Sequence, residues 1–296
     1  MAIRVRVLPV FERAARFALH RRGFQSRTVH TRVARLHAYD ARGLGSLPTV
    51  VVLHGIGSAA TTFGPMLARL RLHARRVVAV DLPGHGFSAA PDDCLTPGVL
   101  FASVAEALDH LVPEPMVLVG NSLGGALALR YAMEQSHRVL ALTLLSPAGA
   151  RVSLAEWEEL LCAFKIDSPA EARRLLGRLY HKTPWYMPAI APDFCDVMKR
   201  RAIRDVLETV TLDDLPPPER LCELTMPVLL WWGQSERVMP SSSLEYFRRH
   251  LPGHAVVEQP AGFGHCPHFD NPQRVAARVI EFAREVSRTA GNAKAS

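Results

Sequence analysis

The residues best suited to chemistry in this sequence lie in one Gly-Asn-Ser-Leu-Gly stretch, residues 120–124. A Val- and Leu-rich run precedes it and a helix-forming run follows it, which predicts a strand, a sharp turn and a helix. Glycines beside the serine let the backbone fold back closely. The turn would present the Ser122 hydroxyl above a helix N-terminus, which favours developing negative charge. We predict that Ser122 is a nucleophile; the alternative is an ordinary Gly/Ser turn.

A nucleophilic serine needs a base, and the base needs a partner that holds its tautomer. Among thirteen histidines, His265 stands out because it follows glycines in a loop after the last expected strand. The acid is expected between serine and histidine in chain order, after the preceding strand. That loop, residues 233–237, offers one carboxylate, Glu236, whose alternative role is a solvated surface side chain. The rival acids are Asp213, Asp214 and Asp270.

Acyl transfer at a serine also needs two backbone N–H groups that point at one oxyanion. We expect the first from Leu123, the residue after the nucleophile. The second is expected from Ile56, which lies between two glycines in the loop after an earlier apolar strand. His54 and His85 are expected to brace their loops rather than react.

The length suffices for one α/β domain with an insertion or for two small domains. The 296 residues are 48% hydrophobic and 21% charged, as in soluble globular proteins. Five cysteines without a C-x-x-C pair argue against a disulfide framework and against a structural zinc site. There is no apolar run of transmembrane length and no continuous apolar stretch typical of a signal peptide. We expect a cytoplasmic protein without a metal site.

The net charge of +7 is concentrated near the N-terminus. Residues 1–42 hold ten Arg against two acidic residues, a balance of +8. The rest of the chain has 25 basic and 26 acidic residues, a balance of −1. The body of the protein therefore lacks the basic patch typical of nucleic-acid binding.

Residues 1–25 form a basic N-terminal segment with a predicted helix over residues 9–22, ended by Gly23. One face of this helix carries Phe11, Ala14, Ala15 and Ala18, and another carries Arg13, Arg16 and His20. The helix is either a weak membrane-surface contact or targeting segment, or a helix packed on the domain edge with a solvated basic face. The mostly alanine apolar face favours the second interpretation. Residues 26–30 and 32–38 alternate like a hairpin of exposed strands.

The remaining core, residues 26–149 and 222–296, alternates buried strands with helices. Strands are expected over residues 49–53, 117–120, 139–147, 226–233 and 254–258, and residues 76–88 are expected to form a strand that runs into a Gly/Pro loop. Helices are expected over residues 62–72, 101–111, the run after Ser122 and residues 273–286. This alternation predicts a mostly parallel, doubly wound sheet covered by helices on both faces.

Residues 150–221 interrupt this pattern with three helical segments. Capping boxes open the first two, at Ser153 with Glu156 and at Ser168 with Glu171, and the third spans residues 194–210. We expect part of the insertion to line an apolar acyl pocket. The alternative is that these side chains only pack the insertion against the core. The pocket candidates are Trp157, Phe164, Trp185, Tyr186 and Met187.

Five motifs in this order resemble the α/β-hydrolase superfamily: HGIGS, DLPGHGFS, GNSLGG, WGQSERVMP and GHCPHFDNP. The resemblance covers roughly residues 45–286. It implies the α/β-hydrolase fold, a helical lid over residues 150–221, a serine nucleophile and no cofactor. The family usually carries Asp where this chain has Glu236, although Glu serves in some members. Ser122 distinguishes the chain from the similar dehalogenases and epoxide hydrolases, which have Asp there.

Within the superfamily the sequence resembles both esterase- or lipase-like members and hydrolases that cleave carbon–carbon bonds of ring-fission products (meta-cleavage-product hydrolases). The latter typically have Trp directly after the catalytic His, whereas Cys266 follows here. We therefore expect hydrolysis of a small hydrophobic carboxylic ester through an acyl-enzyme intermediate. Carbon–carbon hydrolysis is the alternative. A third hypothesis is an inactive hydrolase fold that serves as a binding protein.

Overall fold

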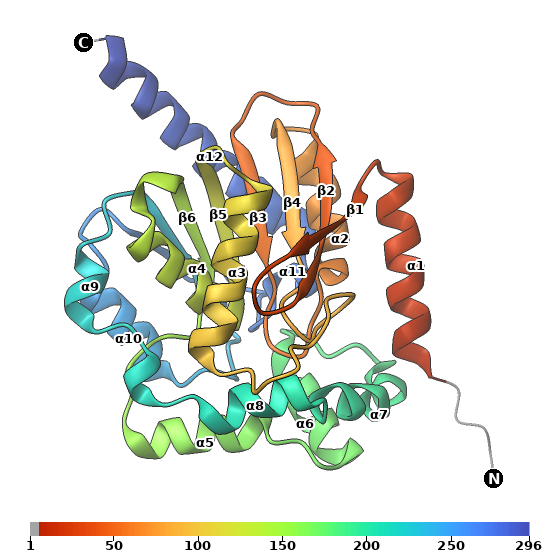
Figure 1. The fold of residues 1–296 in the computed structure, drawn as a ribbon. Helices are drawn as coiled ribbons and strands as arrows, with labels where there is room; N and C mark the ends of the chain where they lie inside the picture. Colours follow the sequence, from red (N-terminus) through yellow and green to blue (C-terminus); the bar gives the residue numbers. More distant parts are fainter. Residues whose placement is uncertain (1–5, 296) are drawn as a thin grey trace.

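The computed structural model describes residues 6–295, and an eight-stranded sheet lies at its centre (Figure 1). The strand order is β1-β2-β4-β3-β5-β6-β7-β8. The β1–β2 and β2–β4 pairs are antiparallel and every other pair is parallel, which confirms the predicted mostly parallel sheet. The strands are β1 (Gln25–His30), β2 (Arg35–Arg42), β3 (Thr49–Leu53), β4 (Arg76–Val80), β5 (Met116–Asn121), β6 (Val139–Leu145), β7 (Val228–Trp231) and β8 (Val256–Glu258).

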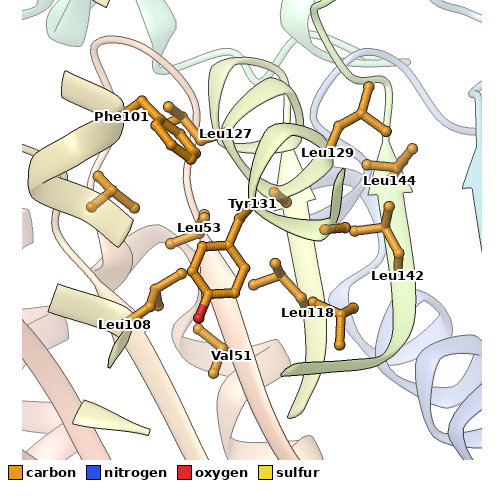
Figure 2. Close-up of a cluster of buried hydrophobic side chains, with 14 of the residues drawn as sticks. Val51, Leu53, Phe101, Leu108, Leu118, Leu127, Leu129, Tyr131, Leu142 and Leu144 are labelled. Atoms are coloured by element: carbon orange, nitrogen blue, oxygen red, sulfur yellow. The ribbon is translucent and has the colours of Figure 1, made fainter. Parts of the chain in front are cut away.

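Helices cover both faces of the sheet, so the central strands are buried on both sides. Successive side chains of a strand point to opposite faces. Val50 and Val52 of β3 therefore join the core under α2 (Gly64–Arg71) and α12 (Pro272–Ala295). Val51 and Leu53 join the core under α3 (Pro97–Leu111) and α4 (Leu123–Glu134), as Figure 2 shows.

The hairpin of residues 26–38 is present, but the expectation that both of its strands are exposed is wrong. β2 pairs with β1 on one side and with β4 on the other, so it lies inside the sheet. Four of its residues in a row are buried, among them Leu36 and Tyr39. β1 is the edge strand and is mostly exposed.

The four longest helices of the insertion, α5 to α8, gather at one end of the sheet (Figure 1). Both predicted capping boxes are confirmed, at Ser153 and at Ser168. The single helix predicted over residues 194–210 is wrong, because the chain leaves helical geometry at Arg200, where ψ is 136°. These four helices are α5 (Leu154–Phe164), α6 (Pro169–Leu179), α7 (Met187–Met198) and α8 (Arg201–Thr209).

The predicted N-terminal helix is present as α1 (Val7–Arg21). It lies against α2 and against α7, so it bridges the core and the insertion. The first five residues of the predicted basic segment lie outside the described range. Over residues 6–295, no helix is both long enough and apolar enough to cross a membrane. The remaining helices are η1 (Ala60–Phe63), η2 (Ser136–Arg138), η3 (Leu212–Asp214), α9 (Pro218–Cys222), α10 (Ser241–His250) and α11 (Pro267–Asp270).

Candidate active site

Ser122 lies at the tight turn between β5 and α4. Its backbone adopts φ 53° and ψ −119°, a conformation that non-glycine residues rarely adopt. Two glycines permit the turn. A Cβ at Gly124 would lie 2.4 Å from the carbonyl oxygen of Leu53, and one at Gly120 would lie 2.2 Å from that of Gly124. The local sequence therefore explains how the side chain of Ser122 is held above the first turn of α4.

His265 and Glu236 form a buried hydrogen-bonded pair. The His265 Nδ1–H donates to Glu236 Oε2 over 2.9 Å, and the two side chains are 2% and 4% exposed. The other carboxylate oxygen, Oε1, accepts the N–H groups of Val238 and Met239 at 2.7 and 3.1 Å. Burial raises the pKa of Glu236, but the charge and hydrogen bond of His265 and these two N–H groups outweigh it. The net pKa is lowered, so Glu236 is a carboxylate at neutral pH.

Two side chains hold the loop of His265 in roles that the sequence interpretation did not predict. Asn121 Nδ2 donates to the carbonyl oxygens of His265 and Leu145, at 3.0 and 2.8 Å. Asp270 accepts the N–H groups of Gly264 and His181, at 2.8 and 2.9 Å. Asn121 adjoins the serine and Asp270 shares the histidine's loop, so proximity in sequence was the available signal for both.

The three rival acids have other contacts or positions. Asp270 bonds to backbone N–H groups, as described above, rather than to the His265 ring. Asp214 accepts hydrogen bonds from the N–H and hydroxyl of Thr211, which caps η3. Asp213 lines a cavity next to Asp214. Of the four candidates, Glu236 is the one in contact with His265.

The loop after β3 passes directly beside the serine, since a Cβ at Gly55 would lie 3.1 Å from the Cβ of Ser122. His54 braces this loop as predicted. Its Nδ1–H donates to the Gly55 carbonyl at 2.8 Å, and its Nε2 accepts the N–H of Leu82 at 3.0 Å. Burial lowers the pKa of His54, which keeps the ring neutral in this role.

The two predicted oxyanion donors flank Ser122. Leu123 opens α4 directly after the serine, and Ile56 lies in the braced loop. Within residues 6–295, the N–H groups of both residues lack a protein acceptor. Two N–H groups at these positions are suited to receive a negative oxygen above Ser122.

Two apolar cavities meet at Ser122. The larger cavity has a volume of about 430 Å³ and is bounded by residues of α3, α4, α5 and α8. The smaller cavity has a volume of about 270 Å³ and is bounded by residues of α1, α6 and α7 and by His265. Ser122, Ile56 and Phe164 line both cavities. A substrate with two apolar parts can thus place its reactive bond at the serine.

The predicted pocket residues are divided between these cavities. Trp157 and Phe164 line the larger cavity, whereas Tyr186, Met187 and Phe164 line the smaller one. The expectation for Trp185 is wrong, because this side chain is 90% exposed and lines neither cavity. α7 begins at Met187, which turns inward, and Trp185 stands in the preceding turn with its ring against the edge of Tyr186.

Comparison with known proteins agrees with this architecture. The profile of the family described as alpha/beta hydrolase matches residues 50–278, well over half of the chain. This chain belongs to the alpha/beta hydrolase family. A relative of this alpha/beta hydrolase is the pimeloyl-[acyl-carrier protein] methyl ester esterase of Xanthomonas campestris pv. campestris (strain B100). It is 30% identical over 262 residues, which cover 81% of this chain and 96% of the relative.

Two solved structures show the same alpha/beta hydrolase fold. Naproxen esterase from Bacillus subtilis has a TM-score of 0.74 and 20% identity, covering 92% of this chain and 97% of its own. The 2-hydroxy-6-oxo-6-phenylhexa-2,4-dienoate hydrolase from Rhodococcus sp. strain RHA1 has a TM-score of 0.75 and 24% identity, covering 88% and 99%. In the part of this alpha/beta hydrolase that the structure describes, no cluster of three or more His, Cys, Asp or Glu side chains is arranged to hold a metal ion.

Proposed function

We propose that this chain is a serine hydrolase that cleaves carboxylic esters with an uncharged, apolar acyl group through an acyl-enzyme intermediate. One observation carries the proposal: the buried Glu236–His265 hydrogen bond lies beside a serine held at a strained turn between two apolar cavities. The methyl ester esterase that is 30% identical supports ester chemistry.

In this mechanism the Ser122 oxygen attacks the ester carbonyl carbon while His265 Nε2 takes the serine proton. Glu236 holds the tautomer with hydrogen on Nδ1 and stabilises the imidazolium that forms. The carbonyl oxygen becomes an oxyanion that accepts hydrogen bonds from the N–H groups of Ile56 and Leu123. His265 then gives its proton to the departing alkoxide, and the acyl group remains on Ser122. His265 then deprotonates a water molecule that attacks the acyl carbon, and the same proton passes from His265 to the Ser122 oxygen as the acid leaves.

The position of His265 supports a separate cavity for each part of the ester. The histidine that took the proton must return it to the leaving oxygen, so the alcohol part of the ester lies on the same side of Ser122 as His265. His265 lines the smaller cavity and is absent from the walls of the larger one. The alcohol therefore occupies the smaller cavity, and the acyl group extends into the larger cavity between α4 and α5.

Carbon–carbon hydrolysis of a dienoate would need a cation to hold the substrate carboxylate. The arginines that line the larger cavity are already paired, Arg130 with Glu134 at 2.9 Å and Arg220 with Glu223 at 3.0 Å. The described walls of the smaller cavity contain the acid Glu12 and no Arg or Lys. These contacts favour a neutral ester over a dienoate.

The insertion acts as a lid in this proposal, because residues of α5 to α8 close both cavities above Ser122. The cytoplasmic location and the absence of a cofactor remain predictions. All five cysteines are free, which suits a reducing compartment.

The test is a rate comparison on p-nitrophenyl esters of increasing acyl length and on one ring-fission dienoate. We expect kcat/KM to rise with acyl length until the larger cavity is filled, and to be much lower on the dienoate. Ser122→Ala should lower kcat by about 10³-fold or more, and a fluorophosphonate should label Ser122. A dienoate rate equal to the ester rate would overturn the assignment, as would a fully active Ser122→Ala variant.

A further inference from the structure

Large apolar side chains are exposed on α1 and on the turn before α7. Val10, Phe11 and Phe17 of α1 are 61%, 56% and 65% exposed, and Trp185 and Tyr186 are 90% and 41% exposed. Val10 and Phe17 are seven residues apart and so share one helix face. We call these five residues the apolar rim.

Contacts on the other side of α1 hold the rim outward. Leu19 is buried in the core, and the Arg16 guanidinium stacks over the Phe87 ring at 4.3 Å. The N–H of Leu8 donates to Asp193 Oδ2 of α7 over 2.8 Å. The helix is thus docked by one face, while Phe11 and Phe17 keep more than half of their surface exposed. Exposed apolar clusters of this kind mark interaction surfaces.

Two residues of the apolar rim, Phe11 and Tyr186, stand at the opening of the smaller cavity. Phe11 and Tyr186 line this cavity and are also exposed, so they stand where it meets solvent. The Trp185 ring lies 5.9 Å from the Tyr186 ring and extends the rim outward. The same cavity reaches Ser122 and His265. A molecule entering between Phe11 and Tyr186 therefore has a direct path to the serine.

The positive charge of α1 indicates what kind of surface the apolar rim binds. Arg13 and Arg21 are exposed, and among the described side chains neither pairs with a carboxylate. The one acid of α1, Glu12, is partly buried, and burial raises its pKa. Exposed arginines beside aromatic side chains on one helix are typical of docking on an anionic lipid interface, where Trp and Phe insert and Arg contacts phosphates.

We propose that the apolar rim and the arginines of α1 dock this protein on an anionic lipid bilayer, and that the smaller cavity takes its ester directly from the bilayer. The substrate part of this inference rests on the proposed function. The acyl chain passes Ser122 into the larger cavity, and the alcohol part stays near the lipid surface beside His265. The rim thereby selects esters that reside in membranes.

Vesicle sedimentation tests the docking, with phosphatidylcholine alone and with added phosphatidylglycerol. The wild type should bind the anionic vesicles and release them at high salt. Arg13→Glu should weaken binding on the order of tenfold or more, at about fivefold for each unit of charge. Trp185→Ser should weaken it on the order of tenfold, since an inserted indole is lost.

Matched controls carry the same changes elsewhere: Leu154→Ser, at a side chain 62% exposed on α5, and Arg249→Glu on α10. Both should bind within about twofold of the wild type. Rates on a dissolved short ester should be unchanged in Trp185→Ser and Arg13→Glu. Ser122→Ala should bind vesicles like the wild type, which separates docking from catalysis.

Two results would overturn the inference. One is vesicle binding that is equally strong with and without phosphatidylglycerol, or that is weakened as much in the control variants as in Trp185→Ser and Arg13→Glu. The other is a wild-type dimer in solution that Trp185→Ser converts to a monomer, because the rim would then be an interface between two copies of this chain.

Discussion

Replacing Glu236 by Gln should disable His265 through its tautomer rather than through its position. In the native protein Oε1 accepts two backbone N–H groups, from Val238 and Met239, and Oε2 accepts the Nδ1–H of His265. A glutamine has one carbonyl oxygen. That oxygen must stay on the two N–H donors, since both would otherwise be left unpaired in a buried site. The NH₂ group then faces Nδ1 and donates to it.

The imidazole must respond by carrying its hydrogen on Nε2, the nitrogen that has to accept the proton of Ser122. The active tautomer becomes a minor form, and the imidazolium loses its buried counter-charge. A neutral amide in place of a buried carboxylate in such a site costs about 10⁴-fold in kcat. This corresponds to about 5 kcal/mol of transition-state stabilisation. KM should change little, because Glu236 lines neither cavity.

The assay is steady-state hydrolysis of a short p-nitrophenyl ester, with Glu258→Gln as the matched control. Glu258 forms a partly exposed ion pair with Arg278, so the control makes the same chemical change outside the site. We expect it to retain activity within about twofold. Glu236→Asp should retain part of the activity, because the charge remains while its reach is shortened.

The reasoning would be refuted if Glu236→Gln kept kcat within about tenfold of the wild type. It would also be refuted if Asp213→Asn or Asp214→Asn proved crippling while Glu236→Gln did not. A Glu236→Gln variant that loses activity only because it is unfolded would be recognised by its circular dichroism spectrum.

Three further predictions concern stability and access. Gly124→Ala should prevent folding or lower the free energy of unfolding by about 3 kcal/mol or more, measured by urea denaturation, because the new Cβ would meet the Leu53 carbonyl oxygen at 2.4 Å. Ala126→Phe should shift the preferred acyl length downward, since Ala126 lines the larger cavity; an unchanged chain-length profile would move the acyl group elsewhere. Iodoacetamide at mildly alkaline pH should modify the exposed cysteines and spare Cys266, whose thiol pKa is raised by burial and by nearby carboxylates, as peptide mass spectrometry would show. The exposed cysteines are Cys94, Cys162 and Cys222.

Acid stability gives a test of the Glu236 carboxylate that does not depend on activity. Its pKa is lower in the folded protein than the unfolded value of about 4.3. A lowered pKa contributes stability above the unfolded pKa, and this contribution is lost as the pH falls through the folded pKa. The difference in the free energy of unfolding between the wild type and Glu236→Gln should therefore shrink as the solution is acidified below about pH 4. A difference that stays constant would contradict an ionised Glu236.

Features encoded within a few residues were predictable from the sequence. The capping boxes of α5 and α6 need a Ser and a Glu three positions apart, and the turn at Ser122 needs its glycines. The burial of β2 was not predictable in the same way, because it depends on pairing with β4, about forty positions along the chain. The break between α7 and α8 falls at Lys199 and Arg200, where neither glycine nor proline marks it.

In the candidate site, too, features encoded locally were predictable and features that depend on distant contacts were not. Chain order and loop position led to the prediction of Ser122, Glu236 and His265, because each follows a strand of the parallel sheet, and the structure brings Glu236 into contact with His265. Asn121 was missed because its amide acts on a carbonyl that arrives from 144 positions away. Trp185 was misplaced since composition indicates an apolar side chain in the insertion but not whether the turn before α7 points it inward or outward.

The presence of Glu rather than Asp at position 236 also has a structural explanation. Its carboxylate turns back on its own loop to accept two N–H groups, two and three residues further on, and still reaches His265 with its second oxygen. An aspartate on the same backbone is one methylene shorter, so it could keep one of these contacts more easily than both. The longer side chain thus lets one carboxylate hold the loop after β7 and orient the ring of His265. The N–H groups of Val238 and Met239 hold Oε1, so that Oε2 faces His265. Through Glu236, these two N–H groups therefore help to keep the hydrogen of His265 on Nδ1.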